Sequence, residues 1–328
     1  MRYVDGVTTK KKISVIGLGT WQFGSQEWGY GAAYAASEAP AIVRRARELG
    51  VTFFDTAEVY AFGRGERILG GALRETGADG TAIVATKLFP VLPVAPVVEQ
   101  RAVASANRLG IRQIDLYQVH QPNPLVSDSS TMRGMAALQR VGLVDAIGVS
   151  NYSLQRWQAA EEALGAPVLS NQVRFSLLRP QAERDLLPYA VKNDRLIIAY
   201  SPLAQGLLSG RYTREHPPPS RVRAMNPLFL PENLDAARPV LNVLRDVAAA
   251  HDASPAQVAL AWVIRHPNVV AIPGASSLAQ LESNVAAADI ALTEEEAHAL
   301  TTAADAFEPA RGARSAVTAL LRGGLRRS

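Results

Sequence analysis

The sequence predicts an α/β protein folded as a (β/α)8 barrel, and three observations carry that prediction. The chain has 328 residues, and such barrels need roughly 250. Eight short runs of aliphatic and β-branched residues recur along it, and they are near-continuously apolar, as parallel strands buried on both faces are. Amphipathic helical stretches separate the runs, and strict alternation of eight strands with helices favours a closed barrel over an open sheet.

The elements are expected in the following order. The strands should cover residues 14–19, 51–55, 81–87, 114–120, 145–150, 168–173, 195–201 and 268–274. The helical pattern covers 38–50, 65–77, 96–110, 130–142, 153–165 and 180–193. Several of these helical stretches close on Gly, the residue that most often ends a helix.

Residues 202–233 form the one long segment without the hydrophobic periodicity of a helix or a strand, and they are rich in Pro, Gly and Arg. Loops of this length in compact domains are usually functional or disordered. We therefore expect an irregular lid over whatever binds at the strand ends. The whole of 1–310 is expected to form a single barrel domain, followed by a basic, mobile tail at 311–328.

The basic pI of 9.4 comes from the tail rather than from the body of the protein. The tail carries five Arg and no acid, so a net charge of +4 for the chain leaves the first 310 residues at −1. A short basic terminus is most simply a solvated one. No nucleic-acid partner and no membrane partner are therefore expected.

Cysteine usage and the apolar runs limit the protein further. There is no Cys, which excludes disulfides and a Cys nucleophile and is compatible with a reducing compartment. The N-terminus lacks the apolar core of a secretory signal, and the most apolar run, 88–98, is short and broken by three Pro. The histidines show no metal-binding spacing. We expect a cytoplasmic protein without a metal.

Residues with titratable side chains lie where the predicted strands end. Asp55 ends the second run, Lys87 the third and His120 the fourth, while Tyr60 follows one turn beyond Asp55. In a barrel these ends converge on one mouth, which is where barrel enzymes place catalysis. A Lys ammonium beside a phenol would lower the phenol's pKa and make it a better acid. Asp55 could instead cap a turn, but that leaves Lys87 and His120 unexplained.

The motifs "GLGTW", "FFDTAEVY", "ATK", "LYQVHQPN", "GVSNY", "NQV" and "YSPLAQGLL" follow one another in this order. Together with "AIPGASS" they resemble the aldo-keto reductase superfamily over residues 10–305, and most of all its bacterial branch related to potassium-channel β-subunits. The resemblance implies hydride transfer between NADPH and a carbonyl or alcohol. It places Asp55, Tyr60, Lys87 and His120 in the family's catalytic tetrad, with Tyr60 as the general acid.

The resemblance also implies a cofactor site that runs around the mouth. Thr20, Trp21 and Asp55 would be inner contacts, Ser150, Asn151 and Gln172 would hold the nicotinamide amide, and Tyr200 would stack on its ring. The pyrophosphate would lie along Ser201, Pro202, Leu203, Gln205 and Leu207, and the adenosine phosphate along Gly274, Ser276, Gln280 and Asn284. Because 274–277 carry no basic residue, Arg211 and Arg221 would supply the charge for NADPH, and NADH is not excluded.

Two other functions stay open beside a catalytic reductase of a small carbonyl substrate. One is a cofactor-bound regulatory or scaffold subunit like the channel partners, and the other is a barrel lyase or isomerase that uses "IPGASS" for a substrate phosphate. Trp28, Tyr30 and Tyr34 predict an aromatic-lined entrance. A monomer is expected, with higher assembly open.

Overall fold

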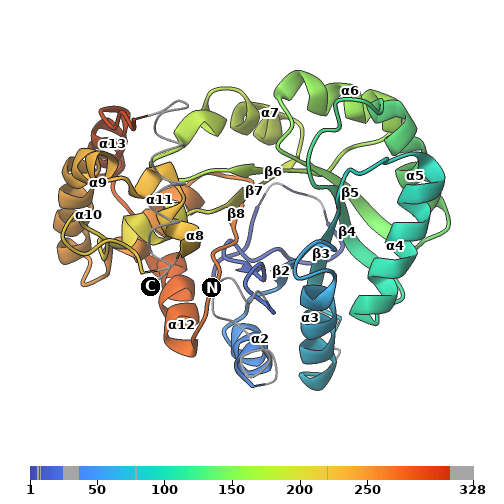
Figure 1. Ribbon diagram of the computed structural model, residues 1–328, viewed down its shortest axis with the longest axis horizontal. Helices are drawn as coiled ribbons and strands as arrows, with labels where there is room; N and C mark the ends of the chain where they lie inside the picture. Colours follow the sequence, from blue (N-terminus) through green and yellow to red (C-terminus); the bar gives the residue numbers. More distant parts are fainter. Residues whose placement is uncertain (6, 8, 25–36, 78–79, 220, 311–328) are drawn as a thin grey trace.

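One sheet of eight strands organises the chain. The computed structural model (Figure 1) describes residues 1–310 apart from 6, 8, 25–36, 78–79 and 220. Each strand pairs in parallel with the next in chain order. The strands are β1 (Leu18–Gly19), β2 (Phe53–Asp55), β3 (Ile83–Leu88), β4 (Ile114–Val119), β5 (Val144–Ser150), β6 (Ser170–Arg174), β7 (Leu196–Tyr200) and β8 (Val269–Ala271).

The first and last strand segments also meet, so the sheet curls into a barrel. Parallel bridges join Ile16 to Ala271 and Gly19 to Gly274. Gly17 N donates to Ala271 O at 2.8 Å across the same seam. The predicted (β/α)8 barrel is confirmed, with β1 shorter than the predicted run because its first residues pair only through isolated bridges.

The helices lie around the outside of the sheet (Figure 1). The longer ones are α2 (Glu38–Glu48), α3 (Arg64–Glu75), α4 (Ala95–Leu109), α5 (Asp128–Arg140), α6 (Leu154–Leu164), α10 (Arg238–Ala250), α11 (Pro255–Ile264), α12 (Leu278–Ala286) and α13 (Glu294–Asp305). Gly110 and Gly165 end α4 and α6 with φ of 69°, a left-handed conformation that Gly adopts without strain. None of the described helices is long and apolar enough to cross a membrane.

Two predicted segments differ in detail. The helix expected over 180–193 divides into η2 (Pro180–Glu183) and α7 (Leu186–Lys192), because the Asp185 carboxylate caps a new start by accepting from Leu186 N at 2.7 Å. The segment 202–233 is not irregular throughout, which corrects the prediction. It contains η3 (Ala204–Ser209), α8 (Arg221–Ala224) and η4 (Pro227–Phe229), and α9 (Pro231–Ala236) begins at its end. Proline at the first position of a turn favours helical starts, which explains η4 and α9.

Apolar side chains fill the space inside the barrel and the space between the sheet and the helices. The inner cluster lies below the strand ends and includes Phe53, Ile83, Leu116, Ile198 and Ile272. The outer cluster is much larger and includes the fully buried Trp157 and Trp262, as expected for residues that pack helices. The barrel interior is therefore a packed floor, and it fixes the positions of the polar residues above it.

Helix α3 packs so closely on the end of α4 that one of its glycines has no room for a side chain. A Cβ on Gly70 would lie 2.1 Å from Leu109 O, whereas one on Gly71 would meet nothing closer than 4.0 Å. We expect Gly70→Ala to lower the free energy of unfolding by about 1–3 kcal/mol. Gly71→Ala, in the same helix, should raise it by about 0.5–1 kcal/mol. Urea denaturation of both variants tests the pair, and equal effects would contradict the packing.

Candidate active site

Three of the predicted site residues form one connected group at the mouth of the barrel. Asp55 ends β2 and Lys87 lies one residue before the end of β3. Lys87 Nζ donates to Asp55 Oδ1 at 2.6 Å, to Thr56 O at 2.7 Å and to the Tyr60 hydroxyl at 3.2 Å. The ammonium therefore uses its three protons on three acceptors, and this fixes the carboxylate and the phenol on either side of it.

The Asp55 carboxylate is held from its other side as well. Gln172 Nε2, on β6, donates to Asp55 Oδ2 at 2.7 Å, and Gln118 Nε2, on β4, lies 3.5 Å from the same oxygen. Asp55 and Lys87 are 2% and 0% exposed. A buried ion pair is tolerated only when hydrogen bonds satisfy its remaining lone pairs, and the glutamines provide them. Sequence reasoning missed Gln118, whose only signal is a polar residue inside an apolar strand.

Burial and the neighbouring charges shift the pKa values of Lys87 and Tyr60 in opposite directions. Burial disfavours the Lys87 ammonium, but the Asp55 carboxylate and the Tyr60 hydroxyl outweigh it and raise the pKa of Lys87. Burial raises the pKa of Tyr60 above 10, and the Lys87 charge offsets this only in part. The prediction that Lys87 lowers the pKa of Tyr60 was thus right about the sign of the lysine's own effect and wrong about the net shift. A sequence does not reveal how deeply a phenol is buried.

His120 completes the predicted tetrad from the end of β4. Its ring meets the Tyr60 ring edge-on, with centroids 6.0 Å apart, and it meets Phe89 in the same way at 5.9 Å. Burial, helped by the nearby Lys87 charge, lowers the pKa of His120 to about 3. His120 Nδ1 is buried and has no hydrogen-bond partner among the described residues. The imidazole is therefore neutral at physiological pH.

Polar groups from β5, β6 and β7 line the next part of the mouth. Ser150 Oγ donates to Gln172 O at 2.8 Å, and the Tyr200 hydroxyl donates to Asn151 Oδ1 at 2.9 Å. Asn151 has a φ of 61° and is exposed. Asn is one of the few residues other than Gly that adopt this left-handed conformation readily. The structure thus brings together the four residues predicted to face the nicotinamide.

The residues predicted from the first strand reach the same mouth. Thr20 is fully buried, and its hydroxyl donates to Asp55 O at 2.9 Å, so it joins the end of β1 to the end of β2. Trp21 follows β1 and is 46% exposed. Trp28, Tyr30 and Tyr34, predicted to line the entrance, lie outside the described residues.

The segment after β7 presents backbone more than side chains. Ser201 and Gln205 have φ of 51° and 56°, and the predicted contacts Pro202 and Leu207 are buried, whereas Leu203 is partly exposed. Arg223 Nε donates to Gln205 O at 3.0 Å, a link that sequence reasoning did not find. The predicted cations Arg211 and Arg221 are not joined to this site by the structure: Arg211 is exposed, and the side chain of Arg221 lies outside what the structure describes.

The segment after β8 makes a compact turn into α12. Gln280 Oε1 accepts from Ser276 N at 2.9 Å and from Ser276 Oγ at 2.8 Å, and Asn284 Nδ2 donates to Gly274 O at 3.3 Å. Ser277 caps α12 by accepting from Gln280 N. The four residues predicted here form two hydrogen-bonded pairs, Ser276 with Gln280 and Gly274 with Asn284. Gln280 occupies the Ser276 donors that a phosphate would need.

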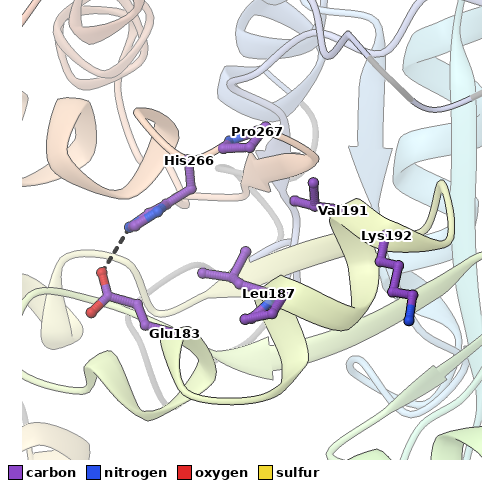
Figure 2. A pocket seen from close by; sticks show the side chains of 7 residues that line it. Glu183, Leu187, Val191, Lys192, His266 and Pro267 are labelled. Carbon is purple, nitrogen blue, oxygen red and sulfur yellow. Dashed lines mark ion pairs between the residues drawn. The ribbon is translucent and has the colours of Figure 1, made fainter.

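A further cavity lies in another part of the molecule. A groove of about 380 Å³ lies between α7 and the turn before β8. Figure 2 shows Glu183 and His266 directed toward each other at one end of it, where His266 Nε2 lies 2.8 Å from Glu183 Oε1. Because His266 and Pro267 precede β8, this groove is not at the strand ends that carry the tetrad.

Comparisons with known proteins find relatives that cover nearly the whole of this chain. An uncharacterized oxidoreductase of Mycobacterium tuberculosis is 58% identical over 310 residues, which cover 94% of each chain. Among solved structures, glycerol dehydrogenase from Gluconobacter oxydans superposes with a TM-score of 0.84 at 28% identity and covers 94% of this chain and 96% of its own. An aldo-keto reductase from Klebsiella pneumoniae in complex with NADPH gives a TM-score of 0.74 at 28% identity and covers 95% and 97%.

The match to a family model has the same extent as the barrel. The model described as the aldo/keto reductase family matches residues 15–305, which run from the first strand segment to the end of α13. The match therefore includes every strand end that supplies the site. The chain belongs to the aldo/keto reductase family.

Proposed function

We propose that this protein reduces an aldehyde or ketone to an alcohol with NADPH, and that Tyr60 is the general acid. The observation that supports this most directly is the position of Lys87 Nζ, which contacts both Asp55 Oδ1 and the Tyr60 hydroxyl in a buried site. A phenol next to a fixed ammonium can give up its proton because the developing phenolate is stabilised by a nearby positive charge.

Each residue of the tetrad has a different role in protonating the carbonyl oxygen. Tyr60 donates its proton to that oxygen as negative charge develops there, and the neutral His120 donates a hydrogen bond that sets its angle. Lys87 stabilises the phenolate that remains, and Asp55, held by Gln172, keeps Lys87 charged and aimed. These groups are in place before the reaction, so no reorganisation cost arises at the transition state.

NADPH is proposed as the cofactor because a structural relative of this chain was crystallised with it. When bound, it supplies the hydride that goes to the carbonyl carbon. Asn151 and Tyr200 would contact the nicotinamide. Ser276 and Ser277, at the start of α12, would bind an anion once Gln280 no longer accepts the hydrogen bonds of Ser276. The exposed Arg211 would add positive charge near the 2′-phosphate, which NADPH carries and NADH lacks, and so would favour NADPH. We also propose that residues 202–233 cover the pyrophosphate.

The low pKa of His120 predicts how kcat/KM depends on pH. Its ordinary pKa is 6.5, and in the folded protein the pKa is about 3, so the imidazole stays neutral as the pH falls from 7 to about 5. We expect kcat/KM to show no inflexion near pH 6.5. The pH–rate profile between about pH 5 and 8 measures this, and an inflexion near 6.5 that His120→Asn removes would contradict it.

The test of the proposed function is a fluorescence titration of the purified full-length protein with NADPH and NADH, followed by addition of propanal. Binding and oxidation of NADPH support the reductase. Binding without turnover would favour a regulatory subunit of the potassium-channel β-subunit branch, against which the complete tetrad argues. No binding of either nucleotide would leave the lyase or isomerase alternative.

A further inference from the structure

Two carboxylates lie on the stretch of chain that carries Tyr60, one on each side of it. Glu58 is in the segment that follows β2, and Glu66 is in the first turn of α3. Their side chains are 8% and 0% exposed. Carboxylates are rarely buried to this degree unless partners replace the water that they lose. The partners of these two therefore indicate why they are buried here.

Glu58 joins the segment after β2 to the end of β3. Its Oε1 accepts from Phe89 N at 2.5 Å and lies 2.5 Å from Arg101 Nη2 on α4. Its Oε2 accepts from Arg101 Nε at 3.1 Å. Glu58 N also donates to Lys87 O at 3.3 Å. The side chain and the backbone of Glu58 therefore both bind the end of β3.

Glu66 makes the same kind of connection from the start of α3. Its Oε1 accepts from the Thr86 hydroxyl on β3 at 2.6 Å, and its Oε2 accepts from Arg108 Nε on α4 at 2.5 Å. Arg108 packs so closely against the start of α3 that a Cβ on Gly63 would lie 2.7 Å from its Cδ. We call the two sets of contacts the carboxylate clamps (Glu58 with Phe89 and Arg101, and Glu66 with Thr86 and Arg108).

The two clamps lie on either side of both Tyr60 and Lys87. Tyr60 is between the two carboxylates along the chain, and Lys87 is between their partners at the end of β3. Gly65 N donates to Tyr60 O at 3.1 Å, so a shift of the start of α3 would also move Tyr60. Because the two segments are joined on both sides, the clamps fix the 3.2 Å separation of the Tyr60 hydroxyl and Lys87 Nζ.

The backbone next to Tyr60 needs support of this kind. Ala61 and Phe62 have φ of 48° and 54°, a region that costs free energy for residues other than Gly. Such a conformation persists only where the surrounding contacts over-determine it. A buried ion pair adds little net stability, because the cost of desolvating two charges offsets their attraction. The clamps are therefore better explained by the geometry that they fix than by stability that they add.

We propose that Glu58 and Glu66 are positioning residues, which act on the reaction by holding the Tyr60 hydroxyl against Lys87 Nζ. This inference rests on the proposed function. If a clamp is weakened, the phenol can move away from the ammonium, and the charge that offsets its burial acts on it less strongly. Proton donation by Tyr60 then slows, and the pKa of Tyr60 rises further.

One variant of each clamp tests the proposal in the full-length protein with NADPH and propanal. Glu58→Gln removes the charge that pairs with Arg101, and Thr86→Val removes the donor to Glu66 at nearly constant volume. Each should lower kcat roughly 10-fold, shift the alkaline limb of the pH–rate profile upward and leave NADPH affinity within about 3-fold. Thr86→Ser, which keeps the hydroxyl, should restore most of the rate.

Glu161→Gln is the matched control. The Glu161 side chain is 14% exposed, accepts from Val168 N at 3.0 Å and pairs with Arg195 Nε at 2.5 Å. It therefore has the same kinds of partner as Glu58, but they belong to other elements of the fold. Its replacement should leave kcat and the alkaline limb unchanged.

A double-mutant cycle with Tyr60→Phe separates positioning from general support of the fold. Residues that act through the Tyr60 hydroxyl should lose their effect once it is absent, so adding Glu58→Gln or Thr86→Val to Tyr60→Phe should lower kcat by less than about 2-fold. An equal loss in both backgrounds, an unshifted alkaline limb, or an equal effect of Glu161→Gln would overturn the inference. Failure of the wild-type protein to reduce propanal would refute the proposed function instead.

Discussion

Replacing Tyr60 with Phe is expected to lower kcat for propanal reduction by roughly 10²- to 10⁴-fold, the size of a general-acid contribution. The substitution removes only the hydroxyl, which accepts from Lys87 Nζ at 3.2 Å. Lys87 keeps its bonds to Asp55 and Thr56, both shorter than 2.8 Å. The positions of the remaining charged groups should therefore not change.

The loss should fall on the chemical step and not on binding or folding. One hydrogen bond to a charged group contributes about 1.5–3 kcal/mol to stability at most, so the variant should stay folded. NADPH affinity should remain within about 3-fold, because the hydroxyl is not among the groups proposed to hold the cofactor. Steady-state kinetics, urea denaturation and fluorescence titration on the same preparation distinguish these effects.

Tyr189→Phe is the matched control for this measurement. The Tyr189 ring, on α7, packs against Trp157 of the outer cluster, and the Tyr189 hydroxyl donates to Glu161 on α6. Its removal should leave kcat unchanged. If Tyr60→Phe kept near-native turnover while folding and binding NADPH, another group would have to supply the proton and the assignment of Tyr60 would be wrong.

The barrel and its mouth could be predicted because the signals were local. A buried parallel strand is apolar at nearly every position, so Asp55, Lys87 and His120 stood out at the ends of three such runs. Parallel strands in a closed barrel bring those ends together without any further information. The eight strands and the convergence of Lys87 on Asp55 and Tyr60 followed from that reasoning.

What could not be predicted depends on how deeply groups are buried and on contacts between distant segments. The donation from Gln172 to Asp55 joins residues 117 positions apart, and no spacing rule connects them. The upward shift of the pKa of Tyr60 arises because burial exceeds the effect of one neighbouring charge. Two of the short helices within 202–233, η4 and α9, start at prolines whose helical role depends on the surrounding packing.

Replacing Lys87 with Met is expected to reduce kcat at least as much as Tyr60→Phe does, and to destabilise the fold as well. The Met side chain fills a similar volume but leaves the Asp55 carboxylate, 2% exposed, without its counter-charge. Breaking a buried ion pair typically costs about 3–5 kcal/mol. Without the ammonium nothing offsets the effect of burial on Tyr60, so the phenol becomes a weaker acid.

The pH dependence separates the two effects of this substitution. The folded pKa of Lys87 is raised above 10.5, so the stability that the ammonium contributes is fully present below that pH. It is lost only as the pH rises through the raised value, and the stability difference between wild type and variant should be complete at pH 7. The alkaline limb of the pH–rate profile should move upward in the variant, because the pKa of Tyr60 rises further.

Lys11→Met provides the comparison that makes the result specific. Lys11 Nζ pairs with Asp115 Oδ1 at 2.5 Å near the opposite ends of the strands, with the Lys11 side chain 31% exposed. Such a pair contributes about 0–1 kcal/mol, and its loss should leave kcat and the pH–rate profile unchanged. If Lys87→Met lowered stability but left the profile unchanged, Lys87 would serve the fold alone. A shifted alkaline limb with a reduced kcat requires that its charge act on the Tyr60 proton.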